Sequence, residues 1–206
     1  MSAPSAFLPF ADQALADFIR GLAAAPSLSE VGDVAKLRRL GEERASQRPG
    51  GPAMPTLEVT LGGGRCGARL YRPQAELRHV VVYLHGGGWT IDSINTHDSM
   101  CRTLAAATGA YLLSVDYRRA PEHPAPAAID DAVAALEWVA SRPPELGRSP
   151  DAVAVAGESA GGTLAALAAL RLRGAPAAPD LLIMAYANTH LGATGGSLES
   201  NAHDGR

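Results

Sequence analysis

Residues 152–170 read AVAVAGESAGGTLAALAAL, and this stretch decides the fold. It opens with a short apolar run, which predicts a buried strand, and it closes with small apolar residues that favour a helix. Between the two lies Gly157-Glu158-Ser159-Ala160-Gly161, a G-x-S-x-G pattern. A tight strand-to-helix turn at this pattern strains the serine backbone and presents the hydroxyl at the carboxyl edge of a sheet. Ser159 is therefore a candidate nucleophile, with a chance match in a Gly/Ala-rich chain as the alternative.

The same alternation of strand and helix continues on both sides of this stretch. Apolar runs predict buried strands at residues 79–85, 111–116, 152–157 and 180–186. Helices are expected between them, at residues 96–108, 127–140 and 161–172. Continuous apolar runs are typical of strands covered on both faces, and strands that alternate with helices are typical of parallel sheets. The sequence therefore predicts the α/β class with a mostly parallel sheet.

The N-terminal part of the chain has a different pattern. Apolar residues at helical spacing predict helices at residues 11–22 and 31–40. Ser27 and Glu30 form a capping box before the second helix, which we expect to end at Gly41. TLEVTL (56–61) and GARLYRP (67–73) alternate with period two around a glycine-rich turn, which predicts an antiparallel hairpin.

Composition excludes several classes of protein. A formal net charge of −3 with 47% hydrophobic residues disfavours both a nucleic-acid surface and intrinsic disorder. The small-apolar stretch at 160–170 is about half the length of a membrane span, and the N-terminus lacks the basic region of a secretory signal. Cys66 and Cys101 have no C-x-x-C spacing, so we expect two buried free thiols in a cytoplasmic protein and no metal site.

A second candidate motif, His85-Gly86-Gly87-Gly88-Trp89, ends the first predicted parallel strand. It therefore lies at the same edge of the sheet as Ser159. Backbone N–H groups of residues without side chains can hold the oxyanion of a tetrahedral intermediate, and each such donor contributes about 3–4 kcal/mol. The alternatives are a purely structural glycine turn and a phosphate loop, whose usual spacing does not occur here. His85 and Gly86 are expected to support the loop rather than to act as a base.

A third segment, DYRRAPEHPAPAA (116–128), links a predicted strand to the next helix. Its charges and prolines predict a rigid, hydrogen-bonded loop, in which His123 is structural.

Taken in this order and spacing, HGGGW, DYRRAPEHPAPAA and GESAGG resemble the hormone-sensitive-lipase group (bacterial family IV) of α/β-hydrolase esterases. The resemblance implies that Ser159 is the nucleophile and that the N–H groups of Gly87, Gly88 and Ala160 form the oxyanion hole. It also implies hydrolysis of carboxylic esters with short acyl chains, without a metal or an organic cofactor. Residues 1–50 would then be cap helices, and residues 51–206 an α/β-hydrolase core.

The pattern breaks after the nucleophile. In this fold the triad order is Ser, then Asp or Glu, then His, but only one strand can be identified after Ser159. We therefore expect the last two strand–helix units, with the triad Asp and His, to be absent. Asp180 begins its strand, at the wrong edge of the sheet, whereas His190 follows that strand and is interpreted as a loop residue. His203 and Asp204 lie in a glycine-rich tail, and none of these four residues is assigned a catalytic role.

The expected absence of a base and of the last two strands has two consequences. A serine without a base is a weak nucleophile, so we expect the 206-residue chain alone to be nearly inactive. Strand 180–186 would become an exposed apolar edge through which the chain self-associates. A non-catalytic small-molecule receptor, or an inactive remnant on the same scaffold, is the alternative function.

Overall fold

The computed structural model describes residues 13, 17, 33–73 and 76–189. The chain forms two compact units, Met1–Asp33 with Ala193–Arg206, and Val34–Gly192. In the first unit Gln13 and Asp17 are helical, and Gln13 Nε2 donates a hydrogen bond of 3.1 Å to Asp17 Oδ1. The apolar positions of the predicted helix 11–22 and the Ser27/Glu30 pair lie outside the described residues.

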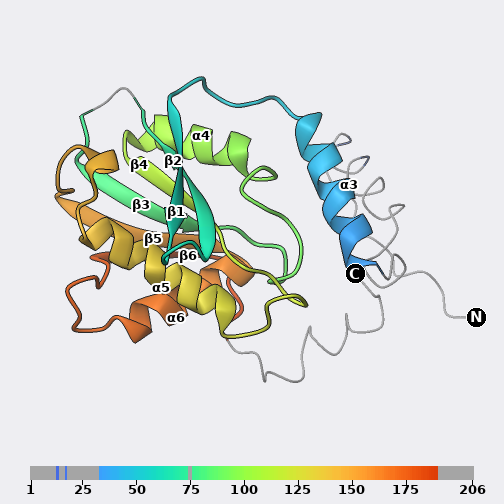
Figure 1. Cartoon of the computed structure of the whole chain (residues 1–206). Coiled ribbons are helices and arrows are strands. Elements are labelled where there is room, and N and C mark those ends of the chain that lie inside the picture. The colour runs from blue at the N-terminus through green and yellow to red at the C-terminus, as the bar shows by residue number, and fades with distance from the viewer. Residues whose placement is uncertain (1–12, 14–16, 18–32, 74–75, 190–206) are drawn as a thin grey trace, which may run out of the picture. The chain divides into compact units, whose positions relative to one another are not determined.

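The second unit is built on a mixed sheet of six strands in the order β1-β2-β4-β3-β5-β6 (Figure 1). The strands are β1 Thr56–Leu61, β2 Cys66–Tyr71, β3 His79–Leu84, β4 Tyr111–Asp116, β5 Ala152–Glu158 and β6 Leu181–Ala185. The β1–β2 hairpin is antiparallel and joins β4 in an antiparallel pair, whereas β4, β3, β5 and β6 are mutually parallel. The predicted hairpin and the predicted parallel sheet are both confirmed.

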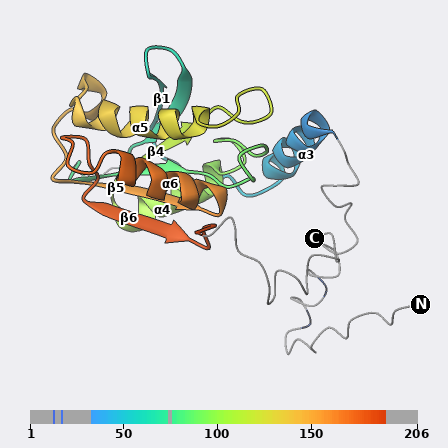
Figure 2. The same cartoon turned by 90° about the horizontal axis from the view of Figure 1, so that it is seen from below.

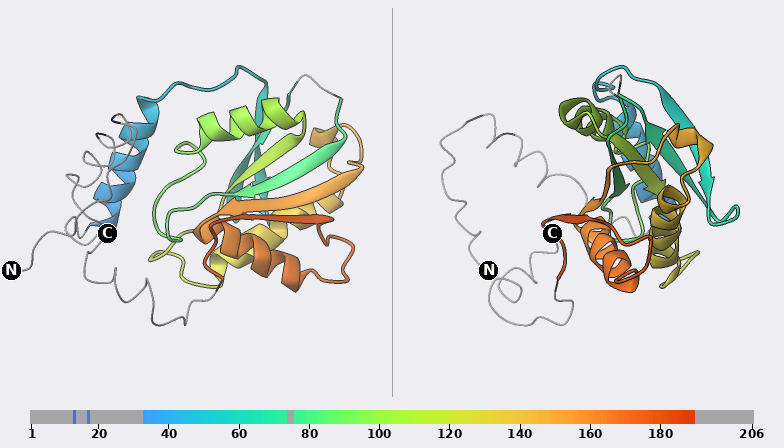
Figure 3. Two further views of the ribbon diagram at one scale, coloured as in Figure 1. Left: turned by 180° about the vertical axis from the view of Figure 1, so that it is seen from behind. Right: turned by 90° about the vertical axis from the view of Figure 1, so that its left-hand side faces the viewer.

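Helices cover both faces of the sheet. α4 (Asp98–Thr108) lies on one face, and α5 (Ala127–Ala140) and α6 (Ala160–Arg171) lie on the other (Figure 3). A short 3₁₀ turn, η1, spans Pro144–Leu146. The three α-helices fall within two residues of their predicted bounds, because each has apolar residues at helical spacing that pack against the sheet.

Each face of the sheet has its own apolar core. The larger core packs under α5 and α6 and includes Leu84, Leu136 and Leu164, whereas the smaller one packs under α4 and includes Tyr71 and Leu112. A helix–sheet–helix arrangement of this kind explains why the central strands are mostly apolar.

The two cysteines are free and buried, as the sequence predicts. Cys66 belongs to the larger core and Cys101 to the smaller one, so the sheet separates the two thiols. Burial raises the pKa of each thiol to about 12. Both thiols therefore stay protonated near neutral pH.

The helix before the sheet is longer than predicted. α3 (Val34–Ser46) continues through Gly41 for five more residues, so the expected end at Gly41 was wrong. The helix is held from outside its own sequence: Arg38 and Glu42, four residues apart on one face, hydrogen bond to loops that follow β3 and β4. These tertiary contacts outweigh the cost of roughly 1 kcal/mol of a glycine inside a helix.

Strand β6 lies at the edge of the sheet, with β5 as its partner (Figure 2). All five of its residues are exposed, and the apolar side chains of Leu181 to Met184 are 37–56% exposed. This agrees with the prediction of an exposed apolar strand at residues 180–186. Among the described residues, no helix is both long enough and apolar enough to cross a bilayer.

The start of α6 approaches the end of β3 through main chain alone. A Cβ atom on Gly161 would overlap the carbonyl oxygens of Leu84 and His85, and one on Gly157 would overlap the Gly161 carbonyl. Glycine at these positions is therefore required by packing.

We predict that Gly161→Ala lowers the free energy of unfolding by about 1–3 kcal/mol, because the added methyl group must push α6 away from β3. Urea denaturation measures the change. Gly50→Ala is the matched control, because its Cβ meets open space, and it should change stability by less than about 0.5 kcal/mol. Equal stability of the two variants would contradict the proposed close approach.

Candidate active site

Ser159 occupies the turn between β5 and α6 in a strained conformation. Its φ of 51° and ψ of −121° are unusual for a residue with a side chain. The turn is held from two sides, since Ser159 N donates to Ala185 O at 2.9 Å and Ser159 O accepts from Thr163 N at 3.2 Å. The strained strand-to-helix turn that the sequence predicts is therefore present, with Ser159 partly exposed and at the N-terminus of α6.

The glycine loop that follows β3 lies against this turn. Gly87 and Gly88 have φ angles of 100° and 59°, and Gly87 O closes the loop by accepting from Thr90 N and Ile91 N at 3.0 and 2.9 Å. Trp89 Nε1 donates to Ala160 O at 3.1 Å and so ties the loop to the first turn of α6. Within the described part of the chain, neither the Gly87 nor the Gly88 N–H group has an acceptor.

His85 lies fully buried beneath the loop. Its ring stacks between Tyr117 and His97, with centroid separations of 4.4 and 5.4 Å. Nδ1 is 2.7 Å from Gly86 O, so Nδ1 carries the proton, and Nε2 has no partner among the described residues. Burial lowers the pKa of His85 to about 3, and the imidazole is therefore neutral near pH 7.

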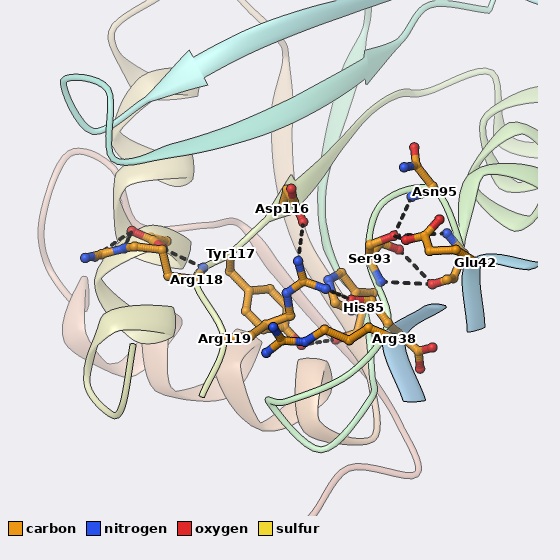
Figure 4. Close-up of polar contacts among 12 residues, drawn as sticks. Arg38, Glu42, His85, Ser93, Asn95, Asp116, Tyr117, Arg118 and Arg119 are labelled. Atoms are coloured by element: carbon orange, nitrogen blue, oxygen red, sulfur yellow. Dashed lines mark hydrogen bonds and ion pairs between the residues drawn. The ribbon is translucent and has the colours of Figure 1, made fainter. Parts of the chain in front are cut away.

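The segment 116–128 is hydrogen-bonded to its surroundings, as the sequence predicts. Tyr117 OH donates to His85 O at 2.8 Å and to Gly86 O at 3.2 Å. The backbone and guanidinium of Arg118 donate to the fully buried carboxylate of Asp131 at 2.9–3.1 Å. Arg119 donates to the carbonyl of Asp92. Figure 4 shows Tyr117 and Arg119 beside His85.

Sequence reasoning missed Arg38 on α3. Its guanidinium donates to Thr90 O and Ala120 O at 2.8 Å each and pairs with the Glu122 carboxylate at 2.8 and 2.9 Å. Arg38 therefore joins the loop after β3 to the loop after β4. The polar pair Arg38/Glu42 at helical spacing was the available signal, but its partners lie about 50 to 80 residues away in the chain.

Glu158, inside the G-x-S-x-G pattern, was also missed. Its carboxylate accepts from the Gly86 N–H group and lies 3.1 Å from His97 Nε2 and 3.5 Å from Tyr83 OH. A charged residue in an otherwise small and apolar segment was the signal that could have identified it.

A cavity of about 850 Å³ lies between α3 and α4. His97 and Met100 line it together with charged residues, of which Arg69 and Asp98 pair at 3.0 Å. Ser159 and the glycine loop are not part of its lining, so the cavity is separate from the strained serine turn.

The described residues do not supply a base for Ser159. Their histidines are His79, His85, His97 and His123, and no hydrogen bond joins any of them to the Ser159 hydroxyl. Asp180 accepts from Val153 N at the start of β5, at the edge of the sheet opposite the site, as predicted. His190, His203 and Asp204 lie outside the described residues. Within the described residues, no three or more metal-ligating side chains cluster together.

We predict that the buried His85 makes stability depend on pH. Its pKa is about 3 when folded and about 6.5 in the unfolded chain, so as the pH falls the unfolded chain binds the proton first. The free energy of unfolding therefore falls from about pH 6.5 toward pH 3, with a slope of up to about 1.4 kcal/mol per pH unit from this group.

Urea denaturation at pH 7 and pH 5 tests this. Wild type should lose roughly 2 kcal/mol more than His85→Asn over this interval. The exposed residue His123 provides the control, and His123→Asn should follow wild type. Equal losses in wild type and His85→Asn would show that His85 titrates normally.

Known proteins resemble this chain in sequence. The model of the alpha/beta hydrolase fold family matches residues 81–205. Esterase LipI of Mycobacterium tuberculosis is 46% identical over 134 residues, which cover 62% of this chain and 42% of the relative. Carboxylesterase NlhH of the same organism is 54% identical over 90 residues, which cover 44% and 28%. The chain thus spans less than half the length of these curated relatives.

Solved structures of esterases also resemble this chain. The thermostable carboxylesterase EstE1, from a metagenomic library, superimposes with a TM-score of 0.74 at 39% identity, covering 82% of this chain and 60% of that one. The hyperthermophilic esterase of Pyrobaculum calidifontis gives 0.77 at 36% identity, covering 92% and 63%. Because the family model matches more than half of the chain, the chain belongs to the alpha/beta hydrolase fold family, in its hormone-sensitive-lipase group.

Proposed function

We propose that the protein hydrolyses carboxylic esters, with short acyl chains favoured, through an acyl-enzyme on Ser159. The observation that carries the proposal is the strained Ser159 turn tied to the glycine loop by the Trp89–Ala160 hydrogen bond. The N–H groups of Gly87, Gly88 and Ala160 would form the oxyanion hole. Esterase and carboxylesterase relatives support the same reaction class.

The proposed chemistry needs two half-reactions. Ser159 Oγ attacks the ester carbonyl carbon, and the carbonyl electron pair moves to oxygen, where the backbone N–H groups stabilise the developing negative charge by donating hydrogen bonds. The tetrahedral intermediate then expels the alcohol and leaves an acyl group on Ser159, which water hydrolyses in the same way. The N-terminal end of α6 adds a favourable dipole for the oxyanion. No metal or organic cofactor enters these steps.

The proton of the Ser159 hydroxyl requires a base, which the proposal does not assign to any described residue. His85 is unsuited, because it is buried, neutral and joined to Gly86 O. In this scheme His85 and Gly86 support the loop. The contacts of Arg38 with Thr90 and Ala120 support the further proposal that residues 1–50 form a cap that shapes the substrate site.

A non-catalytic small-molecule receptor is the second candidate, because the described residues contain no base beside Ser159. The two candidates differ in the reactivity of the serine. A receptor needs a shaped pocket but no reactive hydroxyl, whereas an esterase needs a serine that attacks an electrophile.

We predict that a fluorophosphonate probe labels Ser159 slowly but selectively, because this hydroxyl lies beside the N–H groups that we propose donate hydrogen bonds to the phosphoryl oxygen, although no described residue supplies a base. Intact-protein mass spectrometry with peptide mapping measures the adduct. Ser159→Ala should abolish labelling, and Ser149→Ala, at an exposed loop position, should not. An adduct that persists in Ser159→Ala sinks the assignment, and an unlabelled wild type favours the receptor.

We also predict that the chain self-associates through β6, because its exposed apolar side chains and free edge can pair with a second copy. Light scattering after size-exclusion chromatography should give an oligomer for wild type and a monomer for Ile183→Lys. Leu170→Lys is the matched control, since Leu170 on α6 is 56% exposed but lies off the strand. A wild-type monomer at every concentration tested would contradict this prediction.

A further inference from the structure

We propose that Glu158 is a positioning residue that holds the glycine loop in place beside the nucleophile, and that His97 holds the Glu158 carboxylate. The inference rests on the proposed function, since it assigns the loop a role in binding an oxyanion. It concerns residues that lie next to Ser159 without taking part in bond making.

The carboxylate of Glu158 is buried and multiply bonded. Its side chain is 11% exposed, and its Oε1 accepts from Gly86 N–H and from Tyr83 OH at 3.5 Å and lies 3.1 Å from His97 Nε2. A carboxylate that is removed from water is tolerated only when its oxygens are paired. Hydrogen bonds to a charged acceptor are about twice as strong as neutral ones, so this contact can fix a backbone segment.

Gly86 is shaped to receive this carboxylate. A Cβ atom on Gly86 would overlap both carboxylate oxygens of Glu158, and no other group lies as near to that point. The packing explains why the first glycine of the loop has no side chain, although its φ is not positive. The loop and the carboxylate therefore fit each other directly.

The contact between Gly86 and Glu158 can position the site because each residue is covalently joined to a proposed site residue. Glu158 and Ser159 are consecutive residues on one strained turn, and Gly86 directly precedes the proposed oxyanion donors Gly87 and Gly88. A hydrogen bond from Gly86 N to Glu158 therefore sets the position of the donors relative to the nucleophile. Oxyanion stabilisation depends on donors that are already in place before charge develops.

His97 completes the arrangement from the other side. It directly precedes α4, and its Nδ1 lies 2.9 Å from Thr96 Oγ1, while its Nε2 faces Glu158. Its ring also stacks on His85. The imidazole therefore restricts the Glu158 carboxylate to the orientation in which an oxygen faces Gly86.

The first test measures the loop directly, without any turnover. Amide hydrogen exchange followed by NMR should show Gly86 protected in wild type and at least about tenfold faster relative to Val82 and Leu84 of β3 in Glu158→Ala, as expected for a lost charged hydrogen bond. Glu158→Gln keeps the shape and one acceptor, so it should retain part of the protection. His97→Gln should give an intermediate effect.

The matched control is Asp131→Asn, which replaces a fully buried carboxylate whose hydrogen bonds go to Arg118 and not to Gly86. It should lower global stability but leave the Gly86 exchange rate unchanged relative to β3. If Glu158→Ala does not fold, the test is the Gly86 exchange rate of Glu158→Gln compared with that of wild type. Gly86 exchange that is the same in wild type and in the Glu158 variants overturns the proposal, as does an equal effect of Asp131→Asn.

The second test separates positioning from general structure. With a fluorophosphonate, Ser159 Oγ forms the P–O bond, fluoride leaves, and the serine proton passes to solvent. Glu158→Ala should lower the maximal labelling rate by roughly 10²-fold, as for a lost oxyanion donor, while the probe concentration at half-maximal rate changes little. Glu158→Gln should recover most of the rate.

The two tests keep this inference separate from the proposed function. An unlabelled wild type with a protected Gly86 that depends on Glu158 contradicts the esterase proposal, but it upholds the contact on which the loop position rests. A labelled wild type whose maximal rate is unchanged in Glu158→Ala contradicts the positioning role and leaves the esterase proposal standing.

Discussion

The candidate site depends on one close main-chain contact, between the first turn of α6 and the end of β3. Gly161 lies so near the carbonyl oxygens of Leu84 and His85 that no side chain fits there. This approach brings the N-terminus of α6 beside the glycine loop, and Trp89 then spans the short remaining gap to Ala160. Any residue larger than glycine would separate the strained serine from the loop, even with every other motif intact.

The register of the sheet also brings side chains of the two motifs to the same place. β3 and β5 are adjacent and parallel, and their register pairs Leu84 with Gly157. The next residues, His85 and Glu158, therefore lie at the same level, at the carboxyl edge of the sheet, where loops of parallel strands converge. The glutamate can then reach Gly86 directly. One register between two strands thus determines which residues of the two motifs meet.

Local sequence patterns predicted most of the fold, because the relevant signals are local. The bounds of α5 agree with the prediction, and the Ser159 turn follows from five consecutive residues. Long-range contacts were not predictable in this way. The passage of α3 through Gly41 depends on the Arg38 bonds to distant loops, and the Glu158 contacts depend on residues more than 60 positions away. Neither set of contacts has a fixed sequence spacing that can be identified in a single sequence.

The polar groups below the loop also determine which way its amides face. Gly86 O accepts from Tyr117 OH and His85 Nδ1 in the buried interior. In a planar trans peptide the N–H group points opposite to the carbonyl, so the Gly87 N–H group must face away from that interior. In the next peptide Gly87 O accepts from Thr90 N and Ile91 N, so the Gly88 N–H group points away from these two donors. These carbonyl contacts leave both N–H groups without an acceptor among the described residues, as the proposed oxyanion hole requires.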